Sequence, residues 1–321
     1  MTTSVNVLWG VIIGDACGLP VQFSDREDLV KNPVSTLIGH GTFNKPRGFW
    51  SDDGALTLAT ADALSQGESL PGLMECFAGW LLQGAYTQDG KAYDMGQTTL
   101  TAIRNYQRGM PVDRCGGRSL YDNGNGSLMR ILPVVLWLRA KYSAGFMVNP
   151  VARQYLHDVS ALTHAHPIAQ MACGLYASVA DALLEGLPIP KAIDRGIHQA
   201  MTVYTDDPLF QPYLTLYDSL GDIQKLKRKA ASKIRSGGYV VETLEASLWC
   251  LLTTASYRDA VLKAVNLGHD TDTTAAVCGG LAAIAYGPAS IPAEWIEAIP
   301  RLDLGIGILR RFEWALTKKL P

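Results

Sequence analysis

The sequence lacks an excess of charge of either sign. Its 321 residues include 28 Lys and Arg and 30 Asp and Glu, which leaves a formal net charge of -2. Proteins that bind nucleic acid or anionic membranes through their overall field carry a surplus of basic residues. We therefore expect neither nucleic acid nor a membrane among the partners of this protein.

Paired cysteine motifs are also absent. No CxxC occurs, and the six cysteines are scattered: Cys17, Cys76, Cys115, Cys173, Cys250 and Cys278. This spacing argues against a structural zinc site and against a disulfide scaffold. The N-terminal stretch has no secretory signal pattern, and no uninterrupted apolar run reaches membrane-spanning length. These features together predict a cytoplasmic protein.

Alternation with period two, the mark of a half-buried strand, is missing over any useful length. Apolar residues recur at helical spacing instead, which predicts helices at 4–18, 52–66, 71–84, 95–108, 151–161, 167–186, 239–254, 256–266, 272–286 and 303–318, with two or three more within 190–235. Proline and glycine break any period in 19–50 and 109–126. No linker divides the chain, so we predict an all-α fold with a single domain over residues 1–321.

The segment Asp270-Thr271-Asp272-Thr273 stands at the start of the small, apolar helix predicted at 272–286. One reading is helix capping, because carboxylates and hydroxyls are favoured at a helix N-terminus. Capping explains one acid, whereas two acids and two hydroxyls against a core helix call for a partner. No Lys or Arg is near in sequence, and a hard cation such as Mg²⁺ or Ca²⁺ prefers oxygen ligands. Both readings stay open from this segment alone.

A second segment of the same kind, Ser51-Asp52-Asp53, opens the helix predicted at 52–66. If the two helix starts converge in space, they supply more carboxylates and hydroxyls than capping requires and enough for one or two divalent ions. The candidate metal ligands are Ser51, Asp52, Asp53, Asp270, Asp272 and Thr273.

Gly10, Gly14 and Gly18 repeat every four residues along the first predicted helix. Such a repeat leaves a bare stripe, against which another helix can pack closely. Asp15 lies in the same apolar helix, where it is either a hydrogen-bonded structural acid or a support for a nearby site.

The stretch Asn123-Gly124-Asn125-Gly126-Ser127 runs into a helix predicted from Leu128. Glycines allow backbone N–H groups to point at an anion, and a helix N-terminus adds to this. The alternative is a plain turn with a serine N-cap. Further on, His164 and His166 precede the helix predicted at 167–186. They suit a polar ligand or local loop hydrogen bonds, but no third nitrogen ligand is near for zinc.

Taken together, five motifs resemble the ADP-ribosylglycohydrolase family: GDACGLPVQF, GFWSDDGALTLATADAL, NGNGSLMRILPV, THAHPIA and LGHDTDTTAAVCGGLAAIAYG. They occur in the family's order over about residues 7–287. The resemblance implies an all-α fold with two Mg²⁺ or Mn²⁺ ions in a cleft, held by the six candidate ligands. It also implies that Asn123, Gly124, Asn125, Gly126 and Ser127 bind ADP-ribose, with His164 beside the ligand.

The implied activity is metal-assisted hydrolysis of the glycosidic bond between ADP-ribose and an acceptor such as an arginine side chain of a protein, or a small molecule. Asp53, Asp270 and Gln22 are the candidate catalytic residues. Gln22 departs from the family pattern, in which many members have Glu, and an amide is no base at ordinary pH. This departure leaves several alternatives open: another acid such as Asp15, Asp25 or a metal-bound aspartate takes over, activity is low, or the substrate differs. A protein that binds ADP-ribose with little or no hydrolysis is the alternative function. A metal-dependent phosphoesterase acting on the diphosphate is a third reading.

Overall fold

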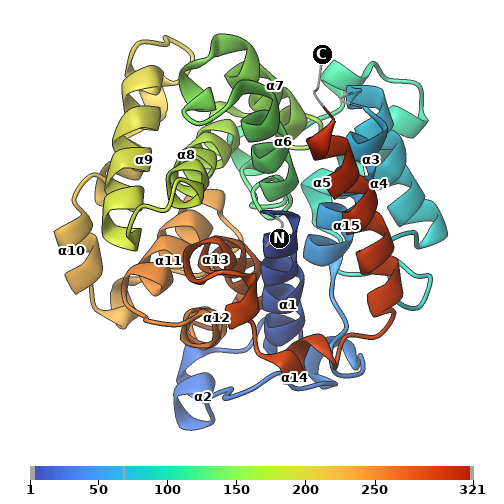
Figure 1. The fold of residues 1–321 in the computed structure, drawn as a ribbon, viewed down its shortest axis with the longest axis vertical. Coiled ribbons are helices and arrows are strands. Elements are labelled where there is room, and N and C mark those ends of the chain that lie inside the picture. Colours follow the sequence, from blue (N-terminus) through green and yellow to red (C-terminus); the bar gives the residue numbers. More distant parts are fainter. Residues whose placement is uncertain (1–3, 68, 319–321) are drawn as a thin grey trace.

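A computed structural model describes residues 4–67 and 69–318 of the chain (Figure 1). Within these ranges the regular structure is helical, and no strand occurs beyond isolated bridges. The α-helices are α1 Leu8–Gly18, α2 Arg26–Lys31, α3 Asp52–Gln66, α4 Leu70–Gln83, α5 Gln97–Gln107, α6 Leu132–Tyr142, α7 Pro150–Ala161, α8 Pro167–Leu184, α9 Ile189–Thr205, α10 Ile223–Arg228, α11 Val240–Leu252, α12 Tyr257–Val265, α13 Thr271–Tyr286, α14 Ala293–Ile296 and α15 Leu302–Thr317. The prediction of an all-α fold is confirmed.

Helices α1 and α13 form the centre of the packing, and every residue of α1 is buried. The glycine stripe of α1 faces α13, as the sequence predicts for a helix partner. A β-carbon added at Gly14 would lie 2.2 Å from the carbonyl oxygen of Ala275, and one at Gly18 would lie 2.4 Å from the Cα of Asp272. The two backbones are therefore in direct contact, which only glycine permits.

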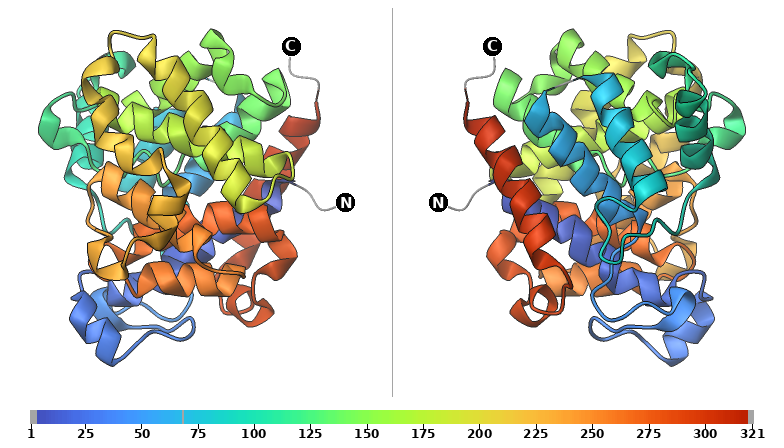
Figure 2. Two further views of the ribbon diagram at one scale, coloured as in Figure 1. Left: turned by 90° about the vertical axis from the view of Figure 1, so that its left-hand side faces the viewer. Right: turned by 90° about the vertical axis from the view of Figure 1, so that its right-hand side faces the viewer.

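Other helices surround this pair in layers (Figures 1 and 2). Helix α3 packs against α1, and α15 and α4 cover α3 from outside. On another side α11 and α12 contact α13, and α8 lies between α13 and the outer helix α9. The buried apolar side chains form one continuous core, so the described residues make up a single domain.

Two details of the predicted helices are corrected. The helix expected from Leu128 begins at Leu132, because Pro133 lies in its first turn and residues 126–130 form consecutive turns before it. The short helix α2 lies inside the stretch 19–50, which was expected to be loop.

Helix α8 alone among the described helices is long and apolar enough to suit a membrane span by length and composition. Its burial offers a different reason for that composition: 83% of its residues are inside the protein, between α7, α9 and α13.

Candidate active site

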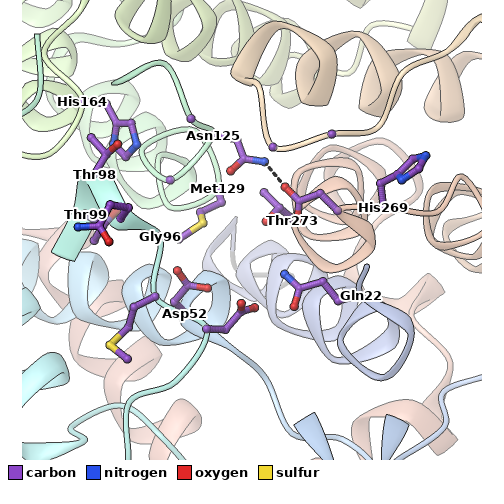
Figure 3. A pocket seen from close by; sticks show the side chains of 18 of the residues that line it. Gln22, Asp52, Gly96, Thr98, Thr99, Asn125, Met129, His164, His269 and Thr273 are labelled. Carbon is purple, nitrogen blue, oxygen red and sulfur yellow. Dashed lines mark hydrogen bonds between the residues drawn. The ribbon is translucent and has the colours of Figure 1, made fainter. Parts of the chain in front are cut away.

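A cavity of about 500 Å³ opens where the first turns of α3, α5 and α13 meet three loops (Figure 3). The starts of helices α3 and α13 contribute Asp52, Asp270 and Thr273 to the lining. Loops on one side contribute Gln22 and Asp94. The opposite side is lined by Gly124, Asn125, Gly126 and His164. The cavity therefore brings together residues that are up to 251 positions apart in the sequence.

The two acidic helix starts meet at this cavity, as the sequence predicts. The Thr273 hydroxyl donates to Asp53 Oδ2 at 3.4 Å, and the Ser51 hydroxyl donates to the same oxygen at 3.2 Å. Carboxylate oxygens of Asp15, Asp53 and Asp272 all lie within 4.8 Å of one another. This spacing suits a divalent cation with oxygen ligands.

Helix capping does not explain these acids. Neither Ser51 nor Asp270, which stand at the N-cap positions of α3 and α13, makes a side-chain cap bond. The cap of α3 comes instead from α1: Asp15 accepts the backbone N–H groups of Ser51 and Gly54 at 2.8 Å. Asp15 is thus the hydrogen-bonded structural acid considered above, and it orients the start of α3.

Among the acids of the two helix starts, two buried carboxylate oxygens remain without any hydrogen-bond partner, Asp53 Oδ1 and Asp272 Oδ2. Burial raises the pKa of Asp52, Asp53 and Asp272 well above the usual range, and the neighbouring carboxylates raise each pKa further. Burial likewise raises the pKa of Asp15 to about 7. Such a cluster is stable in its ionised form only when a cation balances it. The residues present therefore fit a hard divalent ion.

Asp94 is a cavity residue that sequence reasoning missed. It lies in the loop between α4 and α5, with a left-handed backbone at φ +56°, and its Oδ2 is buried without a hydrogen-bond partner. Burial raises its pKa, and the polar groups of Asp272 and Gln22 beside it lower the pKa in part. The Gln22 Oε1 is also buried and unpartnered. The only signal available in the sequence was an acid in a loop without helical period.

The wall opposite Asp94 is built from the Gly/Asn loop. Asn125 donates from Nδ2 to Asp270 Oδ2 at 2.6 Å and to the Thr243 hydroxyl at 2.9 Å, which ties this loop to the acidic floor. Gly124 and Gly126 leave room for the ring of His164, since a β-carbon at Gly126 would lie 2.8 Å from its Cε1.

Two residues predicted to bind ADP-ribose do not reach the cavity. Ser127 is fully buried, and its hydroxyl lies within hydrogen-bond distance of Ser160 and Cys173. Asn123 accepts the backbone N–H of Ala169 at 3.2 Å and so supports the start of α8. Both side chains stabilise the loop from behind, because successive residues of this tight segment point in different directions. They lie outside the cavity lining, and a direct contact with the ligand stays a prediction.

Comparison with known proteins places these features in a family. A family model described as ADP-ribosylglycohydrolase matches residues 4–318. An ADP-ribosylarginine hydrolase of Pseudomonas putida is 29% identical over 92% of this chain and 73% of its own length. The ADP-ribosyl-[dinitrogen reductase] glycohydrolase of Rhodospirillum rubrum is 26% identical over 94% and 91%. A solved ADP-ribosylglycohydrolase-related protein complex has the same fold, with a TM-score of 0.76, 24% identity, and coverage of 99% of this chain and 98% of that one.

Proposed function

This chain belongs to the ADP-ribosylglycohydrolase family and is a hydrolase of that class, and on this basis we propose that it cleaves the bond between ADP-ribose and an arginine side chain of a protein. The name of the Pseudomonas putida relative supports arginine as the acceptor, and that of the Rhodospirillum rubrum relative supports a protein as the substrate. Free ADP-ribose is the expected product, and we propose a cytoplasmic location.

One observation carries the proposal: the buried, unpartnered oxygens Asp53 Oδ1 and Asp272 Oδ2 lie directly behind Asp52 and Thr273, which line a cavity large enough for a nucleotide. Asp52, Asp53, Asp270 and Asp272 would hold one or two Mg²⁺ or Mn²⁺ ions, with the hydroxyls of Ser51 and Thr273 at the edge of the cluster. When bound, such ions would supply positive charge that lowers the pKa of a nearby water and favours binding of the ribose hydroxyls.

The chain's own groups supply the proton transfer and the orientation. Asp94 Oδ2 accepts the proton of the attacking water, since it is unpartnered and its raised pKa brings it closer to neutral pH. The water oxygen bonds to the ribose carbon as the bond from that carbon to the arginine nitrogen breaks, and the departing nitrogen takes up the proton. Gln22 beside it is no base, but its amide orients that water by hydrogen bonding. Asn125 holds Asp270 in place. The carboxylates around the sugar stabilise the positive charge that develops on it as the bond breaks.

The opposite wall binds the rest of the ligand. Gly124 and Gly126 allow close approach of the diphosphate to the loop, and His164 contacts it from beside the two glycines. The sugar then lies over the acids while the diphosphate lies over the glycines.

The test is release of ADP-ribose from peptides that carry one ADP-ribosyl-arginine or one ADP-ribosyl-serine, each with Mg²⁺ and with EDTA. Metal-dependent release from the arginine peptide is the expected result. Release from neither peptide, together with measurable ADP-ribose binding, would favour the binding-only alternative, for which the Gln22→Glu variant should then restore hydrolysis. AMP among the products would indicate phosphoesterase activity instead.

A further inference from the structure

Arg130 is a fully buried cation without a carboxylate partner among the described residues. Its Nη2 donates to the Thr163 hydroxyl at 2.8 Å, and its terminal nitrogens donate to the Val159 carbonyl at 3.4 and 3.5 Å. The guanidinium also lies 4.4 Å from the ring centre of Phe77, while its Nε has no partner. A charge buried in this way destabilises a fold, because no carboxylate offsets the hydration that the guanidinium has lost.

The hydrogen bonds from Arg130 continue to the cavity. The Thr163 oxygen lies 2.8 Å from Nδ1 of His164. A guanidinium can only donate, so the Thr163 oxygen accepts from Arg130. If that oxygen also accepted from Nδ1 through its second lone pair, the hydroxyl hydrogen would have no partner among the described residues. Donation of this hydrogen to Nδ1 is the arrangement that satisfies both groups. Nδ1 is therefore an acceptor, and the ring proton of the neutral imidazole is on Nε2.

Charge around the ring favours the same state. Burial and the positive charge of Arg130 lower the pKa of His164 to about 3, and only Asp122 opposes this shift. A doubly protonated ring would place a second cation against the guanidinium and leave the Thr163 hydrogen without an acceptor. The neutral form thus agrees with the direction of the hydrogen bonds.

Nε2 is left free for a ligand. Among the described residues, no hydrogen bond uses this atom. It lies at the Gly124–Gly126 wall, since a β-carbon at Gly124 would be 3.4 Å from it, and His164 lines the cavity. The histidine backbone is held in place by Gly117, which bonds to Thr163 and Ala165 at 2.9 and 2.8 Å.

We propose that Arg130 and Thr163 are positioning residues that hold His164 with its proton on Nε2, where it donates to a diphosphate oxygen of the ligand. Such an oxygen only accepts, so the other tautomer would present a lone pair to it. The buried positive charge strengthens the donor, because hydrogen bonds in a chain polarise one another. The ligand part of this inference rests on the proposed function, whereas the tautomer does not.

The first measurement is the tautomer of His164 in the ligand-free protein, read from its ring ¹⁵N chemical shifts. The wild type and Thr163→Ser should both have the proton on Nε2, and Thr163→Val, which removes the hydroxyl at nearly constant shape, should lose this preference. A wild-type ring with its proton on Nδ1, or a Thr163→Val ring unchanged from wild type, overturns the relay whatever the activity.

The second measurement is the Kd for ADP-ribose. Thr163→Val should weaken binding about tenfold, as expected for loss of one charge-supported hydrogen bond. Thr163→Ser should stay within about twofold of the wild type. Thr60→Val is the matched control, because Thr60 is equally buried and its hydroxyl bonds only within α3, to the Leu56 carbonyl. Equal losses in Thr163→Ser and Thr163→Val would refute the role of the hydroxyl. A wild type with the Nε2 proton that binds no ADP-ribose would instead refute the proposed function.

Discussion

Replacing Gly14 by alanine tests the contact between α1 and α13 on which the site depends. The new β-carbon would lie 2.2 Å from the Ala275 carbonyl oxygen, 2.7 Å from the carbonyl carbon and 2.9 Å from the Cα of Ala276. All three are backbone atoms, so no side-chain rotation can relieve the overlap and the helices must separate.

Overpacking of a core costs about 1–3 kcal/mol, and three backbone overlaps place this substitution at about 3 kcal/mol on that scale. Alanine recovers about 1 kcal/mol through its better helix propensity. We therefore expect the free energy of unfolding to fall by about 2 kcal/mol. Helix separation should also weaken stabilisation by Mg²⁺, because Asp15 on α1 orients the start of α3, so Asp52 and Asp53 would move relative to Asp272.

The assay is urea unfolding followed by circular dichroism, with Gly79→Ala as the matched control. Gly79 is also inside a helix, α4, but its nearest neighbour would lie 4.0 Å from an added β-carbon. The control should be stabilised by about 0.5–1 kcal/mol. If Gly14→Ala were as stable as Gly79→Ala, the close backbone contact would not be a constraint on this fold.

Three further outcomes are expected. Asp94→Asn should lower kcat by about 10²–10⁴-fold while the Kd for ADP-ribose stays near that of the wild type; an unchanged kcat would remove Asp94 from the proton transfer. Asp53→Asn should raise the melting temperature in EDTA, because it relieves repulsion, and abolish the rise that Mg²⁺ produces; a preserved Mg²⁺ effect would exclude Asp53 as a ligand. In EDTA the folded protein holds a proton on Asp15 up to a pKa of about 7 against an ordinary 3.8, so the free energy of unfolding should fall as pH rises between these values. Denaturation at a series of pH values would contradict this if stability rose across that window.

Much of the helical framework could be predicted from the sequence, because its apolar pattern reflects burial that is nearly complete. Helix α3 occupies the predicted range 52–66, and the glycine spacing in α1 correctly indicated a close helix partner. The identity of that partner could not be predicted. The choice of partner helix depends on residues such as Gly279, whose carbonyl oxygen would be 2.4 Å from a β-carbon at Gly10. The fit between the two helix surfaces can be seen only when the positions of both helices are known.

The acids of the candidate site could be predicted where they stand at the start of a helix. The site residues in loops were harder to predict. Asp52 and Asp270 line the cavity as the motifs suggested. Asp94 went unnoticed because a left-handed loop residue has no periodic context. Ser127 was assigned to the ligand, although the direction of a side chain in a tight turn depends on local backbone angles that composition does not specify.

The glycine stripe also has a consequence for ion size. A β-carbon at Gly18 would lie 2.4 Å from the Cα of Asp272, so the backbone that carries this acid is in direct contact with the backbone of α1. Magnesium requires ligands at about 2.0–2.1 Å, whereas calcium accepts about 2.3–2.6 Å and more of them. Two helices in backbone contact offer no compressible side chain between them with which to adjust the gap. Discrimination between ions of the same charge would then be set by residues that have no side chain at all.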